Sequence, residues 1–117
     1  MTEKWTFNND YLFGLVATNQ KHGTCCLYNN DNDLARVGDT NIIYNSHGDE
    51  IMIKITSVRK CRFCAIDEQW AKIEGEGDLS LQHWIRVHMD FFKKEKSNFK
   101  PTDMLELNEF IVINQRG

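Results

Sequence analysis

The spacing of apolar and polar positions along the chain predicts three helices. One covers residues 10–20, and a second of two turns covers residues 67–74, where Gly75 is expected to end it. Ser80 is a good N-cap for a longer helix over residues 81–96. The apolar stripe predicted for that helix consists of Leu81, Trp84, Ile85, His88, Phe91 and Phe92.

Segments rich in β-branched residues predict strands. Residues 40–44 and 50–58 have this pattern, and the turn over residues 45–49 contains a glycine, so the pair predicts a hairpin. Residues 24–28 and 104–113 are two further strands, the last with clear alternation. Strands and helices interleave without a regular βαβ rhythm, which favours an α+β fold, a mixed β-barrel with peripheral helices.

The length of 117 residues suits a single domain, residues 1–117, with one core and no internal repeat or linker. The apolar run from Tyr11 to Ala17 is too short to span a bilayer, and the first residues do not begin a secretory signal, so we expect a cytoplasmic protein with no membrane contact. The four cysteines are then expected to be reduced thiols.

The formal net charge of −3 argues against a protein that coats nucleic acid with a broad basic surface. Any contact with nucleic acid should therefore be a local pocket or patch. Two basic patches qualify, Arg59-Lys60 with Arg62 and the lysines of residues 93–100. The commoner role of such a patch is a solvated strand or helix end.

No metal or other cofactor is expected. Cys61-Arg62-Phe63-Cys64 has the spacing of a zinc knuckle, but no second pair follows it. The acidic residues that begin at Glu74 suggest a calcium loop, but Leu79 then occupies the position of the sharp-turn glycine and Ile85 that of the bidentate ligand.

Several motifs together resemble those of the ASCH domain family. The segment Glu-Gly-Glu-Gly-Asp-Leu-Ser-Leu over residues 74–81, followed by Trp84, His88 and Phe91-Phe92, resembles the family signature. Trp5-x-Phe7 resembles its Trp-x-Phe-Gly opening, and Val37-Gly38-Asp39 its Val-Gly-Asp turn. Lys21-His22-Gly23-Thr24-Cys25 resembles its Lys-Thr-Ala-Thr-Cys motif, with His22-Gly23 in place of Thr-Ala.

The resemblance, to small bacterial ASCH-domain proteins of the PUA-like superfamily, implies a PUA-like barrel whose partner is RNA or a modified nucleoside. One short bacterial branch removes the acetyl group from N4-acetylcytidine, and other members have been described as ribonucleases. In the amidohydrolase branch, a Lys-x-x-Thr motif supplies base and nucleophile, and a glutamate ending the next helix supplies a proton. Carried over, these are Lys21, Thr24 and Glu74. A hydrolase, a non-catalytic RNA-binding module and a ribonuclease all stay open as hypotheses.

The hydrolase hypothesis places requirements on these three residues. A lysine can deprotonate a threonine only if burial lowers its pKa towards neutrality, so we expect Lys21 in a desolvated site. Residues three apart on a strand face opposite sides, so Lys21 and Thr24 meet only if the chain turns or bulges, which Gly23 allows. The helix dipole is expected to raise the pKa of Glu74 and favour a protonated donor.

Other residues are candidates for substrate binding. His22 is a rival base, because it lies two residues from Thr24 and its ordinary pKa suits neutral pH. His88 is a candidate for a pocket-wall contact, although a histidine on an apolar stripe is more often a hydrogen-bonded core residue. Trp84 is one of several aromatic residues that can stack on a base, and Arg59 is a candidate for binding RNA.

Overall fold

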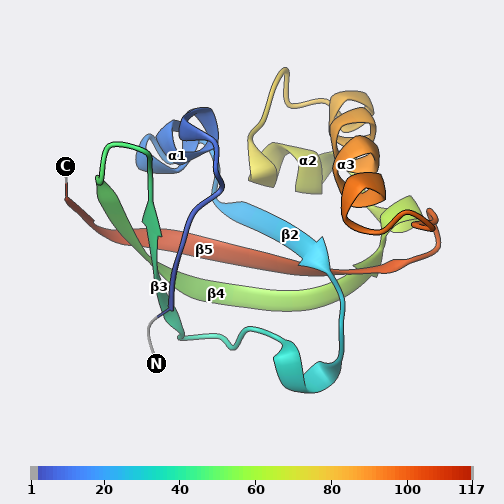
Figure 1. Cartoon of the computed structure of the whole chain (residues 1–117), viewed down its shortest axis with the longest axis horizontal. Coiled ribbons are helices and arrows are strands. Elements are labelled where there is room, and N and C mark those ends of the chain that lie inside the picture. Colours follow the sequence, from blue (N-terminus) through green and yellow to red (C-terminus); the bar gives the residue numbers. More distant parts are fainter. Residues whose placement is uncertain (1–2, 117) are drawn as a thin grey trace.

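The computed structural model describes residues 3–116 and contains one five-stranded sheet (Figure 1). The strands are β1 (Glu3–Trp5), β2 (Gly23–Leu27), β3 (Thr40–Tyr44), β4 (Glu50–Arg62) and β5 (Met104–Arg116). Their order is β1-β3-β4-β5-β2, and neighbours are antiparallel except for β1 and β3, which are parallel. The predicted hairpin is therefore β3 with β4.

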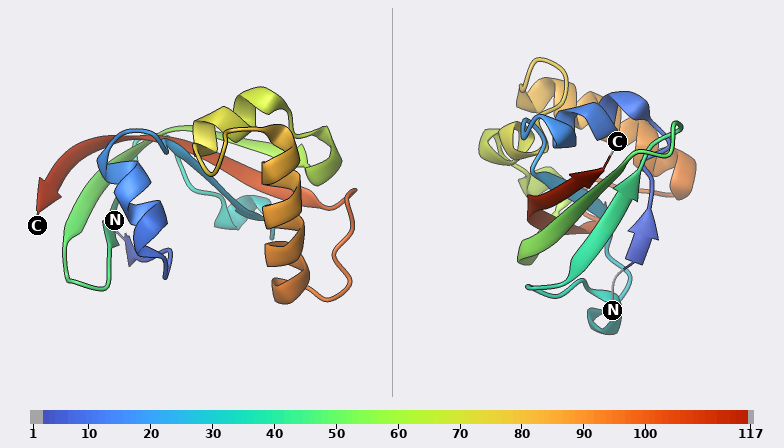
Figure 2. Two further views of the ribbon diagram at one scale, coloured as in Figure 1. Left: turned by 90° about the horizontal axis from the view of Figure 1, so that it is seen from above. Right: turned by 90° about the vertical axis from the view of Figure 1, so that its left-hand side faces the viewer.

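The sheet is strongly curled. β4 and β5 are each 13 residues long, and the register between them shifts at Met52/Ile53 and again at Ile55/Ser57. An extra residue in one strand of a pair bends that strand and increases its twist. Figure 2 shows the two strands as an arch, with α1 and α3 towards its opposite ends. The result is a curled half-barrel sheet with three helices, which confirms the α+β, PUA-like fold class.

Three helices complete the fold, α1 (Asp10–Ala17), α2 (Glu68–Glu74) and α3 (Leu81–Glu95), with 3₁₀ turns at Asp31–Asp33 and Phe63–Ala65. Each α-helix begins where a side chain accepts a backbone N–H of its first turn. These N-caps are Asn9 to Leu12, Asp67 to Trp70 and Ser80 to His83. Within residues 3–116 no helix has both the length and the apolar character needed to cross a bilayer.

The buried side chains form two clusters rather than one. The first lies between α2, α3 and the first half of β5, and includes Trp70, Trp84 and Phe92. The second lies between α1 and strands β3, β4 and β5, and includes Val16 and Phe110. Leu105 and Leu107 of the first cluster alternate along β5 with Glu106 and Asn108, so the first cluster does not cover the polar face of this strand.

The predicted stripe of α3 is only partly correct. Trp84, His88 and Phe92 are buried, at intervals of four residues. Ile85 and Phe91, which were expected to be buried with them, are 40% and 50% exposed. A helix that contacts its core along one i, i+4, i+8 line leaves the adjacent residues on its flank, and that is where these two lie.

Gly75, at the end of α2, is expected to be a position where any side chain lowers the stability of the fold. It has φ +69°, and a Cβ there would overlap the carbonyl of Gln20. We expect Gly75→Ala to lower the free energy of unfolding by at least about 1–2 kcal/mol, measured by urea denaturation. Gly14→Ala is the control, since it lies in α1 with nothing within 4 Å of its Cβ position, and should be stabilising by about 0.5–1 kcal/mol. Equal effects of the two changes would contradict this account.

Candidate functional site

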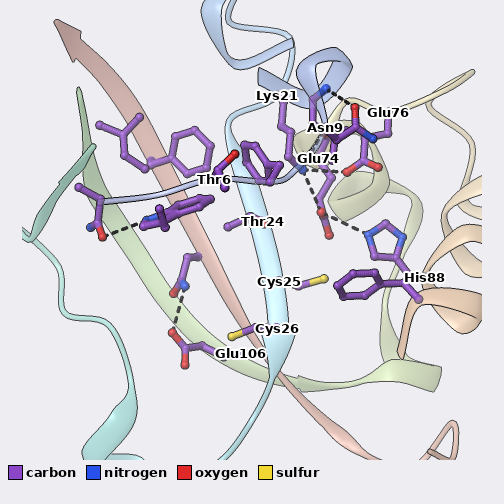
Figure 3. Close-up of a pocket in the computed structure, with 18 of the residues that line it drawn as sticks. Thr6, Asn9, Lys21, Thr24, Cys25, Cys26, Glu74, Glu76, His88 and Glu106 are labelled. Atoms are coloured by element: carbon purple, nitrogen blue, oxygen red, sulfur yellow. Dashed lines mark hydrogen bonds and ion pairs between the residues drawn. The ribbon is translucent and has the colours of Figure 1, made fainter. Parts of the chain in front are cut away.

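A cavity of about 1110 Å³ borders the second hydrophobic cluster, of which Ile53, Ile55 and Phe110 line it. The segment before α1, strand β2 and helix α3 surround it (Figure 3). Lys21, Thr24 and Glu74 all line this cavity, as does His88. Pockets that hold small molecules commonly measure roughly 300–1000 Å³, so there is room for a nucleoside and its water.

Lys21 lies in the turn between α1 and β2, and not on the strand. Its backbone N–H donates to the carbonyl of Leu15 at 3.0 Å, and β2 begins two residues later at Gly23. Lys21 and Thr24 therefore reach the same cavity through this turn, without the bulge that Gly23 was expected to provide. Gly23 instead allows close packing, because a Cβ there would lie 2.5 Å from Ile73 of α2.

Two hydrogen bonds hold this turn against the end of α2. The backbone N–H of His22 donates to the carbonyl of Ile73 at 3.0 Å, and the side chain of Gln20 donates to the carbonyl of Gly75 at 2.7 Å. The residue between the two donors is Lys21, and the residue between the two acceptors is Glu74. These two hydrogen bonds thus bring the charged side chains of Lys21 and Glu74 side by side.

Lys21 and Glu74 form a buried ion pair, and each is only 1% exposed. The Nζ of Lys21 lies 3.1 Å from Oε1 of Glu74 and 2.8 Å from Oε2 of Glu76, which is part of the following loop. It also lies 5.6 Å from the ring centroid of Phe7, whose face helps to shield it. One ammonium is thus shared by two carboxylates, of which that of Glu74 is buried.

The second oxygen of Glu74 is bound by two indole groups. Oε2 accepts from Nε1 of Trp70 at 2.7 Å and from Nε1 of Trp84 at 2.8 Å. His88 approaches the first oxygen, with its Nε2 3.5 Å from Oε1, while its Nδ1 lies 2.9 Å from the carbonyl of Trp84. The carboxylate is therefore fixed by partners from α2, α3 and the turn before β2.

The pKa shifts in this cluster run opposite to those expected from the sequence. Burial alone would lower the pKa of Lys21, but the charges of Glu74 and Glu76 outweigh it and raise the pKa. Burial would likewise raise the pKa of Glu74, yet Lys21, His88 and the indole of Trp84 hold it well below its ordinary value. In the resting site the lysine is therefore protonated and the glutamate ionised.

The pKa of His88 is raised as well. Burial would lower it, but the hydrogen bond and charge of Glu74 prevail. The ring of His88 stacks on that of Trp84, with centroids 4.2 Å apart. His88 lines the cavity as predicted for a pocket-wall residue, whereas Trp84 has its indole N–H on Glu74 and one ring face covered by His88.

Two other predicted residues lie away from this group. His22 is exposed and does not line the cavity. Arg59 is also exposed and outside the cavity, with its guanidinium 5.4 Å from the ring centroid of Trp70. Neither contacts the Lys21–Glu74 pair.

Some cavity residues were not predicted, namely Glu76, Cys25, Glu106 and Asn108. Glu106 and Asn108 share one face of β5, and the alternation of that strand marks this face as polar. The sequence pattern does not distinguish a polar face turned to solvent from one turned to an enclosed cavity. That distinction depends on α3 and on the loop before β3, which lie far away in the sequence.

Cys25, Glu74 and His88 have potential ligand atoms within 4.8 Å of one another, which is close enough for a metal ion. The remaining contacts do not favour one. Both oxygens of Glu74 already have partners, and the ammonium of Lys21 would repel a second cation. Burial, followed by the charge of Glu74, raises the pKa of the Cys25 thiol, which disfavours the thiolate that a metal needs.

Removing the buried ammonium should be far more costly than removing an exposed one. Lys21→Met leaves two carboxylates without their shared cation, and the expected loss of stability is about 3–5 kcal/mol. Lys4→Met is the matched control, because Lys4 pairs with Glu50 at the surface, where its side chain is 54% exposed; the expected loss is about 0–1 kcal/mol. Urea denaturation of both variants measures the difference, and similar losses would show that the buried pair is not stabilising.

Glu74 should also contribute to the pH dependence of stability. Its folded pKa lies below the ordinary value of 4.5, so its contribution is complete above about pH 4.5 and declines as the pH falls further. We expect the urea midpoint of the wild type to fall more between about pH 6 and about pH 3.5 than that of Glu74→Gln. Parallel decreases would mean that other carboxylates account for the acid sensitivity.

Comparison with known proteins agrees with this architecture. The ASCH domain of Lactobacillus crispatus JV V101 superposes with a TM-score of 0.84 at 27% identity, over 94% of this chain and 79% of that one. Protein EF3133 from Enterococcus faecalis V583 superposes with a TM-score of 0.83 at 25% identity, over 98% and 82%. Protein PF0455 from Pyrococcus furiosus shares only the fold, with a TM-score of 0.56 at 16% identity over 97% and 99%.

No protein of curated function matches the chain. The model of the ASCH domain, in contrast, matches residues 3–114, which is nearly the whole sequence and includes every residue of the cavity described above. The chain therefore belongs to the ASCH domain family.

Proposed function

We propose that this protein is an amidohydrolase that removes the acyl group from N4-acylated cytidine. The observation that carries the proposal is the buried Lys21–Glu74 pair in a cavity that Thr24 also lines. Burying two charges costs several kcal/mol per ion, so such a pair is weak evidence of a purely stabilising role. Its position in a large cavity, with the pKa of Lys21 raised and that of Glu74 lowered, is typical of a functional site.

The resting protonation state has to change before Lys21 can act as a base. The proton that makes it an ammonium can move along the existing hydrogen bond to Glu74, over 3.1 Å. The products of this transfer are a neutral amine and a neutral carboxylic acid. A ligand that displaces water from the cavity lowers the local dielectric, which penalises the charged pair and favours the neutral one. Substrate binding would then create the base and the acid together.

The chemical steps follow from those roles. The Oγ of Thr24 forms a bond to the acyl carbon while its proton passes to the amine of Lys21. The bond from that carbon to N4 then breaks, and Glu74 supplies the proton that N4 needs to leave as an amine. Water hydrolyses the acyl-threonine, which returns the hydroxyl and releases the carboxylic acid. Atoms and charge balance with water as the only co-reactant.

The charges around the cavity favour a nucleoside over RNA. One lysine lines it, together with seven acidic residues: Glu3, Asp33, Asp39, Glu74, Glu76, Glu95 and Glu106. A phosphate backbone inside this space would be repelled, and RNA-binding surfaces generally present the opposite charge. The RNA-binding and ribonuclease hypotheses thus have less support from the cavity than the hydrolase hypothesis.

Thr24→Val provides the most direct test, because it keeps the shape of the side chain and removes the nucleophile. We expect hydrolysis of N4-acetylcytidine, followed by chromatography of released cytidine, to fall by at least about 10³-fold. Thr56→Val is the control, since Thr56 is an exposed residue of β4 outside the cavity, and its turnover should be unchanged.

Three results would count against the proposal. Unchanged turnover in Thr24→Val would remove the threonine mechanism. No turnover of N4-acylated cytidine by the wild type would remove the activity itself. Cleavage of labelled RNA by the wild type, lost in Lys21→Met but kept in Lys4→Met, would support the ribonuclease hypothesis in its place.

A further inference from the structure

A second polar group lies in the same cavity, on strand β5. Glu106 is only 6% exposed and belongs to neither the Lys21 ion pair nor the hydrophobic clusters. Its Oε2 accepts from the backbone N–H of Ala35 at 3.1 Å and from Nδ2 of Asn108 at 3.0 Å. Its Oε1 has no hydrogen-bond partner among residues 3–116. One oxygen of a largely buried carboxylate is thus left available to a ligand.

Asn108 offers a second free acceptor. Within the described part of the chain, its Oδ1 is the one buried side-chain oxygen or nitrogen that lacks a hydrogen-bond partner. The orientation of the amide is fixed, because exchanging Oδ1 with Nδ2 would place an oxygen against the carboxylate of Glu106. An unsatisfied buried acceptor costs free energy, and a ligand that donates to it recovers that cost.

The location of these acceptors suggests which part of a nucleoside they meet. Asn108 is the cross-strand partner of Thr24, and its amide reaches from there to Glu106, the partner of Cys26. Two residues along a strand correspond to roughly 7 Å, which resembles the separation between the amine of cytidine and its sugar. A nucleoside whose acylated amine lies between Lys21 and Thr24 would therefore have its ribose near Glu106.

The chemistry of the ligand agrees with that placement. Beyond its exocyclic amine, the cytosine ring presents only acceptors, at O2 and N3, and cannot donate to either free oxygen. The ribose presents two adjacent donors, its 2′- and 3′-hydroxyl groups. We propose that Oε1 of Glu106 and Oδ1 of Asn108 accept these two hydroxyls and form a subsite for the vicinal diol of ribose. This inference rests on the proposed function and adds the sugar specificity of the same site.

The subsite has a consequence for the substrate class. Both hydroxyls must be free to donate, so a nucleotide within an RNA chain, whose 3′-oxygen is esterified, would not satisfy the pair. The nearby carboxylates of Asp33 and Asp39 would also repel a 3′-phosphate. Free ribonucleosides are then preferred over deoxyribonucleosides and over RNA.

Calorimetric titration of the folded protein with cytidine and with 2′-deoxycytidine tests the subsite without any need for turnover. We expect the wild type to bind cytidine about tenfold more tightly, which corresponds to one hydrogen bond to a buried acceptor. In Asn108→Ala this ratio should fall to about one, mainly through weaker binding of cytidine. Asn114→Ala is the matched control, because Asn114 is exposed further along β5 and outside the cavity; its ratio should stay as in the wild type.

The outcomes separate this inference from the proposed function. If Asn108→Ala weakens both ligands equally, or if the wild type does not distinguish them, the diol subsite is refuted while hydrolysis of N4-acetylcytidine still stands. If the wild type neither binds cytosine nucleosides nor hydrolyses N4-acetylcytidine, both fail together. Should Asn108→Ala not fold, Glu106→Gln, which removes the charge but keeps the volume, is expected to reduce the ratio in the same direction, and an unchanged ratio would overturn the inference.

Discussion

The architecture depends on the burial of one ammonium beside one carboxylate. Lys21 and Glu74 come from positions 53 residues apart, and their contact holds the turn before β2 against the end of α2. The cost of desolvating both charges is offset by the indoles of Trp70 and Trp84 and by the second carboxylate, Glu76. Trp70 and Trp84 thus have two roles, because their rings belong to the first hydrophobic cluster and their indole N–H groups hold the carboxylate in one orientation.

This arrangement also organises the electrostatics of the cavity. Its single lysine is already paired with Glu74 and Glu76, and further acidic residues line the same space. Such a surface does not attract phosphate. In the resting state its lysine is protonated and therefore cannot act as a base. A proton that moves from Lys21 to Glu74 would replace the charged pair with a neutral one while the net charge stays the same, and the balance between the two forms depends on how much water remains beside the pair.

Local sequence signals predicted the secondary structure well but not the environment of each residue. The end of α2 at Gly75, the cap at Ser80 and the β3–β4 hairpin follow from short-range chemistry and are confirmed. Strand β1, with only three residues, has too few positions to show a pattern and was missed. The exposure of Ile85 and Phe91 was also missed, because the spacing along a helix does not reveal how wide a face its neighbours cover. Lys21, Thr24 and Glu74, which the family motifs singled out, line one cavity, yet the pKa shifts of Lys21 and Glu74 were predicted with the wrong sign. A helix dipole is visible in the local sequence, whereas an ammonium from a distant turn is not.

The division of the apolar interior into two clusters has a mechanical consequence. The parts around α1 and around α3 are joined by the long ribbon of β4 and β5, which bends where its register shifts, and by the turn before β2, which is hydrogen-bonded to the end of α2. A ligand in the cavity would contact the segment before α1, strand β2 and helix α3 at once. Binding would therefore stabilise these parts together and raise the free energy needed to open any of them locally.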